Sequence, residues 1–179
     1  DILSVETTCT SLNEISKIKK YQKNDVWSAM DAWGSTALMP IFQILGTDYV
    51  DNTIISKKID DYFDLFTKMD FVYKNAVATV KIGKGVKSEG EMIISGTKGY
   101  VYVPAPWWKT DYFEIRYEDQ NKNKRFFYEL EGEGFKYELV NFLRAINHGR
   151  TLSYTGNDVL EEISNVYDKF YNSDDVSLI

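Results

Sequence analysis

The pattern of apolar side chains at the start of the chain predicts a strand and then a helix. Residues 2–10 alternate apolar and polar side chains, as a β-strand with one buried face does. Residues 28–45 repeat apolar side chains at helical spacing, and Gly46 is a typical residue to end a helix. Pro40 removes one backbone donor within this segment, so we expect a kink there.

The middle of the chain is a succession of short alternating segments. In one of them Thr67, Met69 and Phe71 share a face while Lys68 and Asp70 point to the other. The connections are short and rich in turn residues, which favours antiparallel hairpins because parallel strands need long crossovers. Strands are predicted at residues 53–59, 66–73, 76–82, 91–95, 99–103, 111–118 and 124–130.

Two amphipathic segments close the chain. Residues 134–148 form the first helix, with Gly149 as its stop, and residues 157–171 form the second, with Asn157 as its N-cap. The order of strand, helix, many strands and two helices indicates an α+β fold. We expect a large, mostly antiparallel, open β-sheet with helices packed on one face. At 179 residues the chain fits a single domain, residues 1–179.

Composition narrows the list of partners. The net charge of −6 and the pI of about 4.9 disfavour binding to a phosphate backbone, so we expect no nucleic-acid partner. No apolar run is long enough to span a bilayer, so we expect no membrane contact. Cys9 is the single cysteine and forms no intrachain disulfide, which, with no signal peptide at the start, suggests a cytoplasmic protein.

Nucleotide and metal motifs are weak. Gly83-Lys84-Gly85 resembles the start of a dinucleotide-binding loop, but the third glycine is missing and a strand follows where a helix should begin, so we interpret it as a hairpin turn. One histidine and one cysteine leave carboxylates as the main candidate metal ligands. The cluster of Asp60, Asp61 and Asp64 lacks calcium-loop spacing, and we interpret it as a solvated turn. We therefore predict no metal site.

The segment Pro104-Ala105-Pro106-Trp107-Trp108-Lys109 is the most unusual in the chain. Two prolines favour an extended backbone, so we expect the adjacent indoles to point to different sides. Aromatic faces beside a lysine suit sugar or nucleotide binding. The alternative is that Trp107 and Trp108 close the end of the sheet or lie in a subunit interface.

Several segments carry a resemblance to a known family. Ala78-Thr79-Val80-Lys81-Ile82 precedes an I-x-G-T-x-G turn at residues 94–99 and a strand that ends at Pro104, and Gly134-Phe135-Lys136-Tyr137-Glu138 opens a helix. In this order they resemble the C-terminal domain of Gfo/Idh/MocA oxidoreductases. The resemblance covers most of the chain.

This resemblance implies an activity that is divided between two domains. An N-terminal Rossmann domain, absent from this chain, would bind NAD or NADP and supply the family's catalytic lysine, so we expect no cofactor-binding residue here. A sugar or polyol derivative would bind in the cleft between the domains. The family's catalytic histidine follows a helix glycine by two residues, and after Gly34 that position holds Thr36. The family's preceding aspartate position falls on Ala32, next to Asp31.

Two functions stay open at this point. The chain is either the substrate-binding and oligomerisation domain of an NAD(P)-dependent oxidoreductase, or a non-redox binding or dimerising module in which Thr36 has replaced the histidine. Thr is too weak a base to take an alcohol proton near neutral pH. The predicted substrate-binding residues are Asp31, Trp33, Thr36, Trp107, Trp108 and Lys109.

The aromatic strands also predict self-association. An open sheet with helices on one face leaves its other face bare, and monomers rarely expose a large apolar patch. On that bare face we expect two aromatic sets, Phe113, Ile115 and Tyr117 on one strand and Phe126, Tyr128 and Leu130 on the next. We therefore predict a two-fold dimer, or a higher homo-oligomer, through the sheet.

Overall fold

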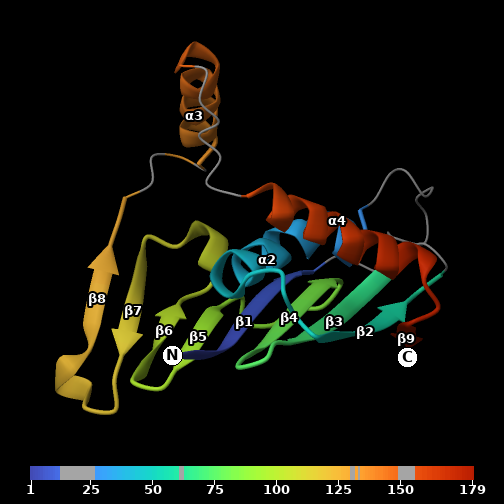
Figure 1. Cartoon of the computed structure of the whole chain (residues 1–179), viewed down its shortest axis with the longest axis horizontal. Helices are drawn as coiled ribbons and strands as arrows, with labels where there is room; N and C mark the ends of the chain where they lie inside the picture. Colours follow the sequence, from blue (N-terminus) through green and yellow to red (C-terminus); the bar gives the residue numbers. More distant parts are fainter. Residues whose placement is uncertain (13–26, 61–62, 130–131, 133, 149–155) are drawn as a thin grey trace.

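The structure, a computed structural model, describes residues 1–12, 27–60, 63–129, 132, 134–148 and 156–179. These residues form one nine-stranded sheet in the order β8-β7-β6-β5-β1-β4-β3-β2-β9 (Figure 1). Two neighbouring pairs, β1 with β4 and β2 with β9, are parallel, and the others are antiparallel. The strands are β1 (Ile2–Ser11), β2 (Asp51–Lys58), β3 (Asp64–Val72), β4 (Val77–Lys84), β5 (Met92–Gly96), β6 (Gly99–Val103), β7 (Tyr112–Arg116), β8 (Lys124–Phe127) and β9 (Val176–Leu178).

Helices α2 (Ala29–Leu45) and α4 (Asn157–Asn172) lie over the sheet and bury its core. The strands contribute fully buried side chains such as Val5, Met69 and Val80, and α2 contributes Ile41 and Phe42. Burial of apolar surface at about 25 cal/mol per Å² is the main stabilising term for such a core. The expected α+β fold with a mostly antiparallel open sheet is confirmed.

The position of β1 corrects one predicted hairpin. Strands β4 and β5 are not neighbours, because β1 lies between them, parallel to β4 and antiparallel to β5. The residues around Gly85 instead pass over the end of β1, where the Gly85 N–H donates to the Ser11 carbonyl at 2.8 Å. The Ser88 N–H likewise donates to the Thr10 hydroxyl at 3.0 Å. Short connections therefore predicted strand direction correctly here but not strand adjacency.

The start of α2 is fixed by two carboxylates. Ser28 is the N-cap, and its side chain and the Asp31 carboxylate form a reciprocal capping box. The second carboxylate, Asp64 of β3, is buried and accepts the Met30 N–H at 3.1 Å and the Thr67 hydroxyl at 2.7 Å. The interpretation of Asp64 as part of a solvated turn is therefore wrong, whereas Asp61 lies outside the described residues.

The helix ends follow the predicted signals in part. Gly46 ends α2 with φ at 82°, in the left-handed region that glycine favours, and the helix continues through Pro40. For α4 the predicted N-cap is one residue late: Gly156 occupies that position, and Asn157 is the first helical residue. The predicted stop at Gly149 lies outside the described residues.

Helix α3 (Phe135–His148) stands apart from the rest of the molecule. Figure 1 shows it separated from the sheet and from α2 and α4. Its large aliphatic and phenylalanine side chains are exposed by fractions between 37% for Val140 and 71% for Phe135. Within the described residues, no side chain of this helix belongs to the core, and no other element makes an extensive contact with it.

The two faces of the sheet differ in chemistry. Ile115 pairs across the strands with Val101, Ile94 and the buried Val5, so Ile115 lies on the side that carries α2. The opposite side, which we call the open face, carries a row of aromatic and charged side chains: Tyr100, Tyr102, Tyr112, Glu114, Arg116, Arg125 and Phe127.

The predicted aromatic sets occupy the helix side of the sheet and not the open face. Phe113 stacks on Phe126 with ring centroids 5.0 Å apart, and the Tyr128 ring centroid lies 6.4 Å from that of Phe113. The prediction erred because alternation along a strand groups side chains by face but does not say which face the helices cover. Leu130 lies outside the described residues.

Candidate functional site

Three tryptophans gather where β1 ends and α2 begins. The Trp33 and Trp108 ring centroids are 4.9 Å apart, and Trp107 meets Trp108 edge-on at 5.9 Å. The Trp33 indole N–H donates to the Ser11 hydroxyl at 3.3 Å. All three rings are half-buried against the core, so they form one aromatic surface, which we call the tryptophan cluster.

A short helical turn, and not an extended segment, presents two of these rings. Trp107–Lys109 form a 3₁₀ turn, and the Trp107 N–H donates to the Gly90 carbonyl at 2.9 Å. A Cβ on Gly90 would lie 3.2 Å from the Trp108 ring, so glycine lets the indole pack directly on the backbone. The expectation of an extended backbone is therefore wrong, although the two rings do face different directions.

The Trp107 indole N–H is buried without a hydrogen-bond acceptor of good geometry among the described residues. Its neighbour is the Cys9 thiol, at most a weak acceptor. Burial raises the pKa of this thiol to about 12, against a smaller lowering by the Trp107 indole. Cys9 is therefore a neutral core side chain that packs under the cluster, and the indole N–H has unused donor capacity.

Thr36 lies one helical turn after Trp33, on the same side of α2. Its side chain is half-buried, and its hydroxyl makes no hydrogen bond to another described residue. The hydroxyl is therefore available to a ligand as both donor and acceptor. Lys109 ends the 3₁₀ turn beside the cluster and is exposed.

Asp31 lies on another side of α2. Its carboxylate accepts the Ser28 hydroxyl at 3.0 Å and the Tyr171 hydroxyl of α4 at 2.6 Å. Burial raises the pKa of Tyr171, and the hydrogen bond to Asp31 adds to this effect. The structure thus brings Trp33, Trp107 and Trp108 together near Thr36, whereas Asp31 fixes the contact between α2 and α4.

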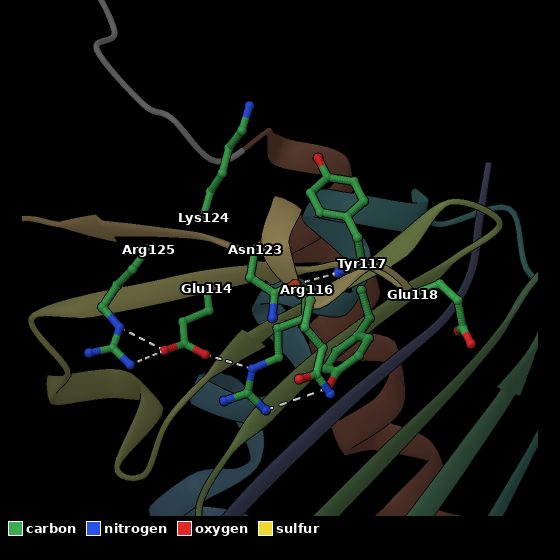
Figure 2. A pocket seen from close by; sticks show the side chains of 9 residues that line it. Glu114, Arg116, Tyr117, Glu118, Asn123, Lys124 and Arg125 are labelled. Carbon is green, nitrogen blue, oxygen red and sulfur yellow. Dashed lines mark hydrogen bonds and ion pairs between the residues drawn. The ribbon is translucent and has the colours of Figure 1, made fainter.

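A separate candidate site, a hollow, lies on the open face (Figure 2). It is a polar cavity of about 710 Å³ between β6, β7, β8 and the loop that joins β7 to β8. Glu114 lies between two guanidinium groups at its edge, with the Arg116 Nε at 2.6 Å and the Arg125 Nε at 2.7 Å. The hydrogen bond from Arg116, together with a second one from Arg125, holds the pKa of the Glu114 carboxyl below its usual range.

Both arginines also lie over aromatic rings. The Arg116 guanidinium is 4.3 Å from the Tyr102 ring centroid, and the Arg125 guanidinium is 4.8 Å from that of Tyr112. Such cation–π contacts hold the guanidinium planes in place. This cavity was not predicted, because its charges come from alternate positions of two strands whose register the sequence does not reveal.

Gly34 lies where a side chain of α4 packs directly on the backbone of α2. A Cβ there would lie 2.7 Å from the Tyr167 hydroxyl. This hydroxyl donates to the Met30 carbonyl at 2.9 Å and accepts the Ser35 N–H at 3.0 Å. The glycine beside Thr36 therefore has a packing role that explains its presence without any catalytic function.

The described residues show neither a cluster of three or more candidate metal ligands nor a helix long and apolar enough to cross a membrane. No protein-family profile matches the sequence, and no curated protein matches it.

Solved structures match the fold of the whole chain. KijD10, a 3-ketoreductase from Actinomadura kijaniata in complex with NADP and TDP-benzene, gives a TM-score of 0.77 at 15% identity, over 100% of this chain and 55% of its own. Aldose-aldose oxidoreductase from Caulobacter crescentus, complexed with glycerol, gives a TM-score of 0.73 at 14% identity. The match covers 96% of this chain and 53% of that enzyme. An Agrobacterium radiobacter oxidoreductase in complex with NAD+, L-tartaric acid and magnesium gives a TM-score of 0.70 at 15% identity. The match covers 97% of this chain and 55% of that oxidoreductase.

These matches bear out the resemblance at the level of the fold. The chain has the fold of the C-terminal half of Gfo/Idh/MocA-type oxidoreductases. It spans about half the length of the solved structures that it matches. At this level of identity the likeness establishes the fold, and the activity has to be argued from the site.

Proposed function

We propose that this chain is the substrate-binding and oligomerisation domain of an NAD(P)-dependent oxidoreductase that acts on a sugar or polyol derivative. The observation that carries the proposal is the tryptophan cluster next to Thr36, on the fold of the C-terminal half of such enzymes. Flat aromatic surfaces with one hydroxyl and one lysine nearby suit a polyhydroxylated ligand, whose C–H faces stack on rings and whose hydroxyls need polar partners.

The chemistry requires a second unit. Oxidation of an alcohol removes a hydride from carbon and a proton from oxygen, and both acceptors must lie within contact of the substrate. Thr36 can hydrogen-bond the reacting oxygen but is too weak a base to take its proton. We therefore place the nicotinamide cofactor and the acid–base lysine on an N-terminal Rossmann domain that is not part of this chain.

The complete protein provides the direct test. With NADP or NAD and a panel of aldoses, polyols and nucleotide sugars, we expect reduction of the nicotinamide to depend on one class of sugar. Thr36→Ala should slow this reaction by about tenfold or less, because one hydrogen bond of about 1 kcal/mol is lost. A loss of a thousandfold or more would mean that Thr36 has a larger chemical role than its hydroxyl explains.

Replacement of the family's histidine by Thr36 supports the second candidate, a binding module without redox activity. Thr36→His distinguishes the two. If the remaining machinery is intact, this change should raise dehydrogenase activity. If neither form reduces the cofactor while the sugar still binds, the non-redox module is the better description.

Self-association through the open face is part of the proposal. Aromatic side chains there include Tyr100, 38% exposed, and Phe127, 70% exposed, beside the paired arginines. We expect a dimeric mass by light scattering at tens of micromolar. Phe127→Glu should give a monomer, whereas Phe126→Glu, on the other face of the same strand, should not. A monomeric mass for the unmodified chain would contradict the proposal.

A further inference from the structure

Helix α3 is an amphipathic helix whose apolar side has no partner among the described residues. Five apolar side chains recur at helical spacing along one side and remain largely exposed: Phe135, Leu139, Phe142, Leu143 and Ile146. Two phenylalanines and three aliphatic side chains thus form one exposed apolar surface, and contiguous surfaces of this kind mark interaction sites. An isolated 14-residue helix is also marginal in water, so a packing partner is expected.

The chain leaves the sheet for α3 at the same end of the sheet as the tryptophan cluster. The Tyr128 N–H, just after β8, donates to the Asp111 carbonyl at 2.8 Å. Asp111 follows the 3₁₀ turn that carries Trp107 and Trp108 by two residues. The strand that leads to α3 is therefore tied to the same end of the sheet as the candidate substrate site.

We infer that α3 is the element through which this chain docks onto the nucleotide-binding unit of the complete enzyme. The inference rests on the proposed function. A nicotinamide that exchanges hydride with a substrate at Thr36 must lie within contact of that substrate, so the unit that holds it borders the tryptophan cluster. The matched structures contain nearly as much chain again beyond the aligned part, enough for such a unit. An apolar helix at this border supplies the contact.

Hydrogen exchange of residues 135–148 is the first measurement, made on the complete protein and on the 179-residue chain. In the chain alone, α3 amides should exchange rapidly because the helix lacks tertiary packing. In the complete protein we expect exchange to be at least about tenfold slower, which corresponds to a modest local stabilisation.

Two matched variants identify the face that docks. Phe142→Glu places a charge in the apolar stripe, and Arg144→Glu places the same side chain on the opposite side of the same helix. Glu is a good helix former, so neither change breaks the helix itself. In the complete protein, Phe142→Glu should lower the melting temperature by at least about 4 °C and abolish the slowed exchange, whereas Arg144→Glu should leave both unchanged. In the 179-residue chain neither variant should shift the melting temperature.

The outcomes separate this inference from the proposed function. If the complete protein reduces NADP or NAD with a sugar but α3 exchanges as fast as in the chain alone, the docking inference is wrong and the proposed function survives. If α3 of the chain alone becomes protected as its concentration rises, a second copy is the partner and the inference is wrong. If the complete protein has no nucleotide-binding unit, both are wrong.

Discussion

Helices α3 and α4 have nearly the same sequence pattern and opposite environments. Each carries an apolar stripe at helical spacing, and each is about four turns long. In α4, Val166 and Phe170 are 1% and 2% exposed, whereas in α3, Phe142 and Ile146 are 63% and 61% exposed. An amphipathic sequence therefore indicates that one side of a helix will be buried, but it does not identify the surface that buries it. The apolar side of α4 packs on the core of this chain, whereas the apolar side of α3 is inferred to pack on a surface outside this chain.

The largest effect should come from truncating one phenylalanine in each helix. Phe170→Ala removes a buried ring from the core beneath α4, and we expect a loss of about 3–5 kcal/mol in the free energy of unfolding. Phe142→Ala in α3 should change it by less than about 0.5 kcal/mol, because the ring contacts little within the chain. Urea unfolding of the 179-residue chain measures both, and similar losses would show that α3 packs on this chain.

A smaller difference in stability is expected when the carboxylates near the first turns of α2 and α3 are removed. Asp64→Ala removes the buried acceptor of the Met30 N–H at the start of α2, and a loss of about 1–3 kcal/mol is expected for the orphaned donors. Glu138→Ala changes an exposed carboxylate in the first turn of α3 and should cost less than about 0.5 kcal/mol. Equal effects in thermal unfolding would contradict the role given to Asp64.

The contact between α2 and α4 can be tested at Gly34. Gly34→Ala displaces the Tyr167 hydroxyl and with it two hydrogen bonds of about 1 kcal/mol each, while alanine returns about 1 kcal/mol of helix propensity. The net loss should be about 1 kcal/mol. In a Tyr167→Phe background the hydroxyl is already absent, but the Met30 sulfur would still lie 2.9 Å from the added Cβ, so Gly34→Ala should cost less than in the natural chain. Additive effects in this double-mutant cycle would exclude the contact as the cause.

Alkaline pH should lower the stability of the folded chain through two groups packed in or against the core, Cys9 and Tyr73, whereas stability near neutral pH should not depend on their ionisation. Burial raises the pKa of Cys9 from 9.0 to about 12, and burial followed by the Glu162 charge raises that of Tyr73 from 10.0 to about 12. Both groups bind protons more tightly when folded, so their contribution is complete below pH 9 and is lost as the pH rises to about 12. Urea midpoints should fall across this window, and Cys9→Ala should make the fall shallower.

Local patterns predicted the elements well because they depend on nearest neighbours. The helix ending at Gly46 and the hairpin at residues 96–99 follow from turn chemistry and periodicity. The insertion of β1 between β4 and β5 depends on pairing between distant segments, which alternation does not encode. Strand β9 was missed because three residues are too few to show alternation.

The site was predictable only in part for the same reason. Composition singled out Trp107 and Trp108, and the family glycine singled out Thr36, but nothing in the spacing brings Trp33 to within 4.9 Å of Trp108. Asp64 was misinterpreted because an acidic cluster in a turn is usually solvated, and its burial appears only once α2 lies across β3.

The division of substrate and cofactor binding between two domains can be tested by two titrations of the 179-residue chain, monitored by tryptophan fluorescence. Three of its four tryptophans lie in the cluster, so a ligand there should change the signal. We expect a sugar or nucleotide sugar to change the fluorescence and Trp108→Phe to reduce the change, whereas NADP and NAD should not bind. Micromolar binding of NADP or NAD to this chain, or no response to any sugar, would contradict the claim that it carries the substrate side of the enzyme without the cofactor side.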